Sequence, residues 1–265
     1  MTKGKGKVFL VGAGPGDPKL ITVYGLECIQ KADVIAYDRL VNKDLLSYAK
    51  KEAELVYCGK APGNHIFIQE EINHLLVTKA RQGKIVTRLK GGDPFVFARG
   101  GEEAEVLSKA QISYEIVPGI TSGIAAPAYA GIPVTHRGFG RSFTMIAGTG
   151  REDDGIDEVN WEAIANGSDT IAFYMGTRNL TYICQQLILH GKDSSTLVAV
   201  IQEGTTIHQK TVMGTLETIE KNVAEAKIKH PAMIVVGNIV QLREKLHWFK
   251  EKGENADECH RVPTF

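Results

Sequence analysis

Residues 8–18 read Val8-Phe9-Leu10-Val11-Gly12-Ala13-Gly14-Pro15-Gly16-Asp17-Pro18, an apolar run that leads into a glycine-rich turn. The pattern predicts a first strand followed by a ligand-binding loop or by a plain βα turn. Glycine permits positive φ and close backbone approach, and proline stiffens the loop. A dinucleotide fingerprint, G-x-G-x-x-G, would need glycine where Asp17 stands, and an acidic side chain there would repel a pyrophosphate. The loop is therefore predicted to bind a ligand other than a phosphate.

The composition is that of an ordinary globular protein of one or two domains. The chain has 265 residues and a formal net charge of zero, so no nucleic acid or anionic membrane partner is predicted. Between residues 79 and 99 basic side chains outnumber the single acidic Asp93, which indicates either a solvated face or the wall of a cleft for an acidic ligand. The basic residues are Lys79, Arg81, Lys84, Arg88, Lys90 and Arg99.

Cysteine and histidine usage predicts a cytoplasmic protein without a metal. The four cysteines are far apart and form no C-x-x-C pair, which fits reduced thiols. The eight histidines show no H-E-x-x-H spacing. No apolar run approaches the ~20 residues of a membrane span. The first apolar run breaks at Gly12, too early for a signal peptide, so no membrane contact is expected.

Apolar periodicity predicts alternating strands and helices in the first half of the chain. Strands are expected at 8–12, 33–37, 55–58, 84–89 and 114–117, with helices at 20–32, 69–82 and 100–110. This alternation predicts an α/β domain with a largely parallel sheet. Each strand ends on small, polar or charged residues, and ligands bind outside the carboxyl ends of such strands. The chemistry is therefore expected at one edge of the sheet.

The second half repeats the composition of the first without a sequence repeat. After a small-residue helix at 124–130, strands are expected at 142–147, 170–174, 197–201, 209–213 and 232–236, and helices at 179–190 and 216–226. Residues 148–159 are predicted to form a polar surface loop. The predicted organisation is an N-terminal α/β domain at 1–134, a C-terminal α/β domain at 135–249 and a flexible tail at 250–265.

A series of short motifs follows the glycine loop in a fixed order. They are Tyr37-Asp38-Arg39-Leu40-Val41, Gly59-Lys60, Arg88-Leu89-Lys90-Gly91-Gly92-Asp93-Pro94-Phe95, Arg99-Gly100-Gly101-Glu102-Glu103, Val117-Pro118-Gly119-Ile120-Thr121-Ser122, Phe173-Tyr174-Met175-Gly176 and Glu203-Gly204-Thr205. Together with the loop, this series closely resembles the tetrapyrrole methylase family over about residues 7–249. No single motif is specific, but their order is.

The resemblance implies two α/β domains with an active-site cleft between them, S-adenosylmethionine as methyl donor, no metal, and a homodimer. The implied reaction transfers two methyl groups to carbons 2 and 7 of uroporphyrinogen III and gives precorrin-2, for siroheme or cobalamin synthesis. The donor pocket that the resemblance implies is Pro15, Gly91, Gly92, Asp93, Val96, Thr121, Ser122, Met175, Gly204 and Ala232. The family commonly carries alanine where Ser122 stands.

Carbon methylation needs close positioning of the reactants and a base for the proton that leaves. By the resemblance, Asp38 is the proton acceptor and Lys60 the proton donor. An ion pair of Asp38 with Arg39, and simple carboxylate binding by Lys60, are the competing interpretations. The substrate's carboxylate arms call for cations. We assign Arg39, Lys90, Arg99 and Arg137 to them.

Several other assignments keep alternatives. Asp93 is either a donor contact or a turn residue, and Met175 belongs to the pocket or to the core. His65 and His136 are interpreted as structural. For the whole chain, the competing functions are methylation of a later corrin precursor and a nucleotide-binding oxidoreductase or binding module, against which Asp17 argues.

Overall fold

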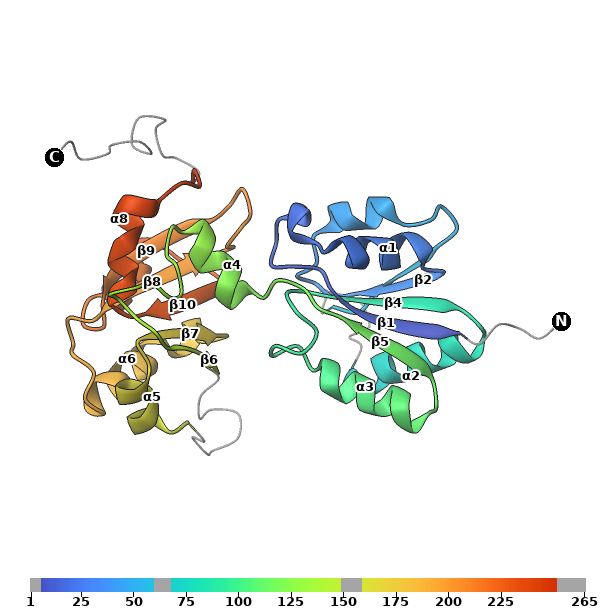
Figure 1. Cartoon of the computed structure of the whole chain (residues 1–265), viewed down its shortest axis with the longest axis horizontal. Coiled ribbons are helices and arrows are strands. Elements are labelled where there is room, and N and C mark those ends of the chain that lie inside the picture. The colour runs from blue at the N-terminus through green and yellow to red at the C-terminus, as the bar shows by residue number, and fades with distance from the viewer. Residues whose placement is uncertain (1–5, 60–67, 149–158, 252–265) are drawn as a thin grey trace. The chain divides into compact units, whose positions relative to one another are not determined.

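The computed structural model describes residues 6–59, 68–148 and 159–251 (Figure 1). The chain divides into two compact units, Met1–Thr121 (unit 1) and Ser122–Phe265 (unit 2), each with a five-stranded sheet. The predicted α/β class is therefore confirmed. The boundary lies earlier than the predicted one after residue 134, because helix α4 (Ser122–Tyr129) packs on the second sheet.

Unit 1 contains an all-parallel sheet in the order β3-β2-β4-β1-β5, as the alternation of elements predicts. Its strands are β1 (Lys7–Gly12), β2 (Val34–Tyr37), β3 (Glu54–Tyr57), β4 (Ile85–Lys90) and β5 (Ser113–Val117). Its α-helices are α1 (Val23–Lys31), α2 (Gln69–Arg81) and α3 (Gly100–Lys109). Figure 1 shows α1 on one face of the sheet and α2 and α3 on the other.

Successive residues of β1 serve the two faces of this sheet. Val8 and Leu10 pack in one buried cluster with Leu76 of α2 and Leu107 of α3. Val11 packs in a second cluster with residues of α1. Each face of a parallel sheet is thus covered by helices, which is why its strands are apolar on both sides.

The first helix begins later than its apolar pattern predicts. Thr22 is its N-cap and accepts a hydrogen bond from the Gly25 amide at 3.0 Å. Residues Pro18–Leu20 form a separate 3-10 helix, η1. A second 3-10 helix, η2 (Lys43–Tyr48), was not predicted.

Unit 2 has a mixed sheet in the order β6-β7-β10-β8-β9, with β6 and β7 parallel and the other neighbours antiparallel. Its strands are β6 (Phe143–Ala147), β7 (Thr170–Tyr174), β8 (Leu197–Gln202), β9 (Lys210–Thr215) and β10 (Ala232–Val236). Its helices are α4, α5 (Trp161–Gly167), η3 (Thr177–Asn179), α6 (Leu180–Leu189), α7 (Ile219–Glu225), η4 (Asn238–Leu242) and α8 (Arg243–Leu246).

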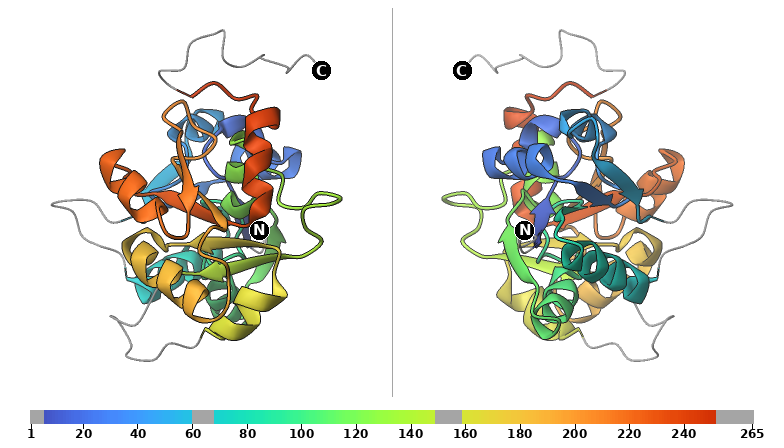
Figure 2. Two further views of the ribbon diagram at one scale, coloured as in Figure 1. Left: turned by 90° about the vertical axis from the view of Figure 1, so that its left-hand side faces the viewer. Right: turned by 90° about the vertical axis from the view of Figure 1, so that its right-hand side faces the viewer.

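Helices cover both faces of the second sheet as well. Figure 2 shows α5 and α6 (yellow to orange) on one side of it and α8 (red) on the other. Phe173, Ile183 and Ile234 share one buried cluster there. Helix α5 was not predicted, although Asn160 caps it and accepts a hydrogen bond from the Ala163 amide at 3.0 Å. No helix in the described ranges is long and apolar enough to cross a membrane.

Three glycines bring the loops after β1, β4 and β5 into backbone contact. A Cβ atom built on Gly12 would lie 2.6 Å from the carbonyl oxygen of Gly92 and 2.7 Å from the Cα of Gly119. A Cβ on Gly119 would clash with the same Gly92 oxygen. Gly92 also exchanges backbone hydrogen bonds with Gly14, at 2.8 and 3.2 Å. Only residues without a side chain fit at this crossing.

We expect Gly119→Ala to lower the free energy of unfolding by about 1–3 kcal/mol, because the backbone of Gly92 has to move away from the new methyl group. Gly101→Ala is the matched control, since a Cβ there meets nothing within 4 Å. In a helix that change should be neutral or stabilising by up to about 1 kcal/mol. Urea unfolding followed by circular dichroism measures both. Equal unfolding midpoints for the two variants would show that the crossing tolerates a side chain.

Candidate functional site

The predicted site residues of unit 1 gather at one edge of its sheet. Because all five strands are parallel, their carboxyl ends lie along the same edge. Pro15 follows β1, Asp38 follows β2, Asp93 follows β4 and Thr121 follows β5. Gly91, Gly92 and Val96 lie in the same loop as Asp93. Lys60 and His65 lie outside the described residues.

Asp17 has a structural task in the glycine loop. Its side chain is the N-cap of η1 and accepts a hydrogen bond from the Lys19 amide at 2.9 Å. An acidic residue is a preferred N-cap. The loop is also held from outside, because the Asn42 side chain donates to the Gly16 carbonyl at 2.9 Å. The acidic residue that breaks the dinucleotide fingerprint thus starts a turn of helix.

Asp93 joins two of the loops. Its Oδ1 accepts a hydrogen bond from the Phe95 amide at 2.8 Å, and its Oδ2 accepts one from the Gly119 amide at 3.0 Å. The first bond is the turn interaction that Asp-Pro sequences favour, and the second fixes the β5 loop beside the β4 loop. The loop continues through Phe97 and Arg99, which both have left-handed backbone at φ 52° and 59°.

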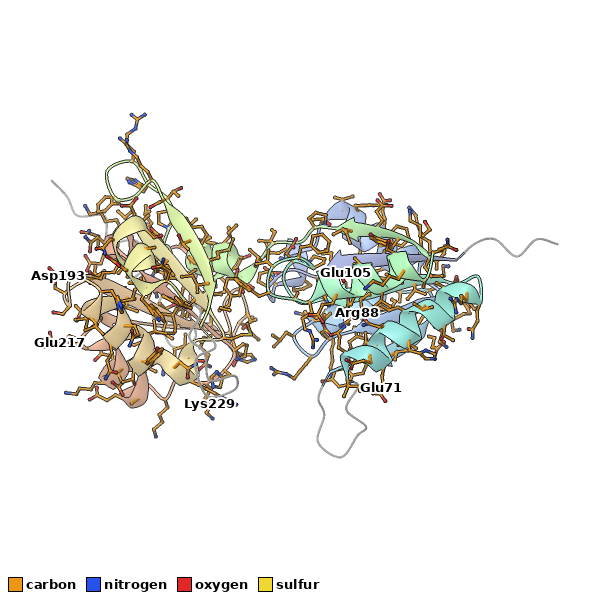
Figure 3. All side chains as sticks on the ribbon, turned by 90° about the horizontal axis from the view of Figure 1, so that it is seen from below. Glu71, Arg88, Glu105, Asp193, Glu217 and Lys229 are labelled. Atoms are coloured by element: carbon orange, nitrogen blue, oxygen red, sulfur yellow. The ribbon has the colours of Figure 1, made fainter. Side chains whose placement is uncertain are left out.

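Beneath this edge lie two buried cations that share one buried carboxylate. Arg88 and Lys90 are each 2% exposed, and Glu103 of α3 is 0% exposed. Glu103 Oε1 accepts hydrogen bonds from Arg88 Nε at 3.1 Å, Lys90 Nζ at 2.8 Å and Gln69 Nε2 at 3.2 Å. Its Oε2 has no hydrogen-bond partner within the described part of the chain. Figure 3 labels Arg88 in unit 1.

Asp38 connects this buried group to the sheet edge. Arg88 Nη2 donates to Asp38 Oδ1 at 2.6 Å, and the Asp38 side chain is 31% exposed. Its partner is therefore Arg88 on the neighbouring strand, and the alternative pairing with Arg39 is wrong. Arg88 bonds Glu103 with one edge of its guanidinium and Asp38 with another, so the fork orients the Asp38 carboxylate.

Arg88 and Lys90 differ in how firmly they hold their protons. Burial by itself lowers the pKa of Arg88, but the charges of Glu103 and Asp38 outweigh it and raise that pKa above its usual value. For Lys90, burial and the positive charge of Arg88 lower the pKa below its usual value. Arg88 is thus a permanent cation beside Asp38, and Lys90 is the more easily deprotonated of the two.

The cations assigned to substrate carboxylates have different surroundings. Lys90 is buried and paired with Glu103, so the structure does not present it to a substrate and that assignment is corrected. Arg99 is exposed, and it forms a forked pair with Glu102 at 2.8 and 2.7 Å. Arg39 and Arg137 are exposed.

The predicted site residues of unit 2 also meet at one sheet edge. Strand β10 runs antiparallel to β7 and β8, so Ala232 at its start lies opposite Gln202 near the end of β8. Gly204 and Met175 follow β8 and β7 at that edge. Helix α4, which begins at Ser122, is fixed there by a hydrogen bond from the Gly123 amide to the Tyr174 hydroxyl at 2.7 Å.

This second edge has unusual backbone geometry. Met175, Glu203 and Thr205 have left-handed backbone, with φ of 55°, 45° and 71°. Such conformations cost non-glycine residues about 1–3 kcal/mol each and cluster at functional sites. Met175 is also 54% exposed, so the interpretation as a core residue is wrong. No sequence signal pointed to this geometry.

The described residues contain no metal-binding cluster, and His136 makes local contacts only. In residues 6–59, 68–148 and 159–251, no cluster of three or more His, Cys, Asp or Glu side chains could hold a metal ion. His136 is exposed; its amide donates to the Gly140 carbonyl at 3.2 Å, and its ring packs edge-on against Phe139. Among the described residues of unit 1, the candidate site comprises the glycine loops, Asp38 and the buried charges of Arg88, Lys90 and Glu103.

Comparison with known proteins identifies relatives across most of the chain. Residues 7–220 match the family described as Tetrapyrrole (Corrin/Porphyrin) Methylases. The uroporphyrinogen-III C-methyltransferase of Priestia megaterium is 63% identical over 235 residues, which cover 89% of this chain and 98% of that protein.

Solved structures agree with the sequence relatives. The uroporphyrin-III C-methyltransferase of Thermus thermophilus, in complex with S-adenyl homocysteine, has a TM-score of 0.74 and 35% identity, covering 89% of this chain and 99% of its own. A cobalt precorrin-4 methyltransferase has a TM-score of 0.79 and 31% identity, and the match covers 88% of this chain and 95% of that chain.

We expect Glu103→Gln to cost about 3–5 kcal/mol of stability, because Arg88 and Lys90 then share only Asp38 as an anion. Adding Lys90→Met should recover part of the loss by removing one unpaired cation. The control is Glu105→Gln on the same helix (Figure 3), whose exposed pair with Lys109 is worth at most about 1 kcal/mol. Denaturant unfolding at fixed pH measures all three. If the double variant is no more stable than Glu103→Gln alone, Lys90 is not an unpaired buried cation in the single variant.

Proposed function

We propose, from the premise that the chain belongs to the tetrapyrrole (corrin/porphyrin) methylase family, that it methylates uroporphyrinogen III with S-adenosylmethionine as donor. Membership of the family, predicted from the order of the motifs, is confirmed. The observation that carries the proposed activity is the 63% identity to a uroporphyrinogen-III C-methyltransferase over 98% of that protein's length.

The proposed reaction adds methyl groups at carbons 2 and 7 and gives precorrin-2, a precursor for siroheme or cobalamin. The proposal includes a homodimer in the cytoplasm that uses no metal and binds neither nucleic acid nor membrane. Bound S-adenosylmethionine supplies an electrophilic methyl group to a pyrrole carbon. What the chain itself has to provide is a place for the donor, anchors for the macrocycle's carboxylates and an acceptor for the proton that leaves.

The glycine loops suit the donor. At Gly12, Gly92 and Gly119 the backbone packs without side chains, and a Cβ on Gly204 would clash with Ala126. A donor that carries a cationic sulfonium needs backbone carbonyls and close approach more than it needs a basic side chain. We assign donor binding to Pro15, Gly91, Gly92, Asp93, Val96 and Thr121 in unit 1, and to Ser122, Met175, Gly204 and Ala232 in unit 2.

Asp38 is the proposed proton acceptor. Arg88 occupies its Oδ1, whereas Oδ2 accepts no hydrogen bond from the residues that the structure describes. The carboxylate is therefore oriented by one oxygen and able to take a proton on the other. Lys60 stays the predicted proton donor. For the carboxylates of the macrocycle we retain the exposed arginines Arg39, Arg99 and Arg137.

A methyltransferase for a later corrin precursor is the second candidate. It is favoured by the similarity to the cobalt precorrin-4 methyltransferase. That protein is 31% identical to this chain, against 63% for the uroporphyrinogen-III enzyme, so we rank it second.

The reaction itself can be tested with purified protein, uroporphyrinogen III and S-adenosylmethionine without oxygen. We expect a product that carries two added methyl groups, identified by its mass and absorption spectrum. Methyl transfer to a later corrin precursor, with none to uroporphyrinogen III, would establish the second candidate instead. Calorimetric titration with NAD(P) is the control for the oxidoreductase alternative and should show no binding.

We expect Asp38→Asn to reduce turnover by about 10²–10⁴-fold, the usual contribution of a general base. Binding of S-adenosylhomocysteine should stay within about twofold, because that contact does not need the charge of Asp38. Asp44→Asn, at an exposed aspartate in η2, is the matched control and should keep full activity. Steady-state kinetics and calorimetry measure both effects. Turnover like the wild type in a folded Asp38→Asn protein would remove Asp38 as the base.

A further inference from the structure

A second buried carboxylate, far from Asp38 in the sequence, has a full set of partners. Glu251 is 9% exposed. Its oxygens accept hydrogen bonds from Arg243 Nη2 at 3.1 Å, Gln209 Nε2 at 3.1 Å, the Thr211 amide at 2.7 Å and Thr211 Oγ1 at 2.5 Å. All of these partners are donors. The reaction proposed above uses none of them.

The first branch of this network leads to the loop after β8. The side chain of Gln209 donates to Glu251, and its Oε1 accepts a hydrogen bond from the Thr205 amide at 2.7 Å. Thr205 is 3% exposed and has left-handed backbone at φ 71°. It directly follows Gly204. Glu251 therefore acts, through Gln209, on the backbone beside Gly204.

The second branch leads to α4. Arg243 is 9% exposed, and its Nη1 donates to the Ala130 carbonyl just after the last turn of that helix, at 2.7 Å. Ala126 of the same helix packs closely on Gly204. A Cβ atom built on Gly204 would clash with the Cβ of Ala126. The Arg243–Glu251 ion pair, at 3.1 Å, thus ties the helix on one side of Gly204 to the loop on the other.

We propose that Glu251 is a positioning residue for the methyl donor: it holds α4 and the loop at 203–209 together, so that Gly204 keeps the backbone conformation that the donor contacts. The inference rests on the proposed donor role of Gly204. Burial by itself raises the pKa of Glu251, but the hydrogen bonds from Thr211 and Gln209 and the charge of Arg243 lower it below its usual value. The carboxylate is therefore ionised at neutral pH.

The test is Glu251→Gln, which keeps the shape of the side chain but turns an NH₂ group toward partners that are all donors. We expect the Kd for S-adenosylhomocysteine and the KM for S-adenosylmethionine to rise about tenfold, as for one lost hydrogen bond to a charged group. The KM for uroporphyrinogen III, and kcat at saturating donor, should stay within about twofold. Calorimetry and steady-state kinetics separate these quantities.

The matched control is Glu217→Gln, which removes the same charge from an exposed position (Figure 3). It should leave the Kd for S-adenosylhomocysteine, both KM values and kcat unchanged. If Glu251→Gln does not fold, Gln209→Leu removes the bonds of Gln209 to Thr205 and to Glu251 but keeps the Arg243–Glu251 pair, and it should give the same loss of donor affinity.

The outcomes distinguish this role from the proposed function. A wild-type chain that binds S-adenosylhomocysteine, with unchanged donor affinity in the folded variants, overturns the positioning role alone. A lower melting temperature with an unchanged KM for the donor does the same, because a merely structural contact changes the folded fraction and leaves KM unaltered. A wild-type chain that binds no S-adenosylhomocysteine overturns the proposed function and this role with it.

Discussion

The backbone crossing at Gly12, Gly92 and Gly119 is the constraint on which the site in unit 1 depends. The carbonyl oxygen of Gly92 lies so close to the other two glycines that no side chain fits between the loops after β1, β4 and β5. Asp93 then joins the loops after β4 and β5 through the amides of Phe95 and Gly119. The three glycines bring no charged side chain to this crossing, so a charged catalytic group has to come from elsewhere on the sheet edge. The proposed base, Asp38, directly follows β2, the strand beside β4 in the sheet.

Much of this arrangement can be predicted from the sequence because it depends on local patterns. Apolar runs that end in glycine or charged residues located all five strands of unit 1 and the edge where they end. The partner of Asp38 could not be predicted, because it depends on strand order. Strand β4 inserts between β2 and β1, which brings Arg88 beside a residue 50 positions away. Arg39, the neighbour in sequence, is exposed instead.

The types of residue do not indicate the backbone conformations at the sheet edge of unit 2. Met175, Glu203 and Thr205 adopt backbone conformations that glycine usually takes, and they do so because the surrounding contacts of unit 2 outweigh the strain. The division of the two compact units between Thr121 and Ser122 has a related reason. Gly131-Ile132-Pro133 looks like a join, whereas the small residues of α4 before it serve close packing on Gly204. Small side chains indicate tight packing as readily as they indicate a linker.

The alternation of Arg88 and Lys90 in an otherwise apolar strand was a signal of buried charge. Residues two apart on a strand share a face, and here that face is covered by α3 with Glu103. The order of the two cations follows from their chemistry. Burial and the positive charge of Arg88 lower the pKa of Lys90. Arginine keeps its charge, and its planar fork reaches Glu103 and Asp38 at once. The position nearest the proposed base thus needs a side chain that reaches two carboxylates, whereas Lys90 behind it bonds Glu103 alone.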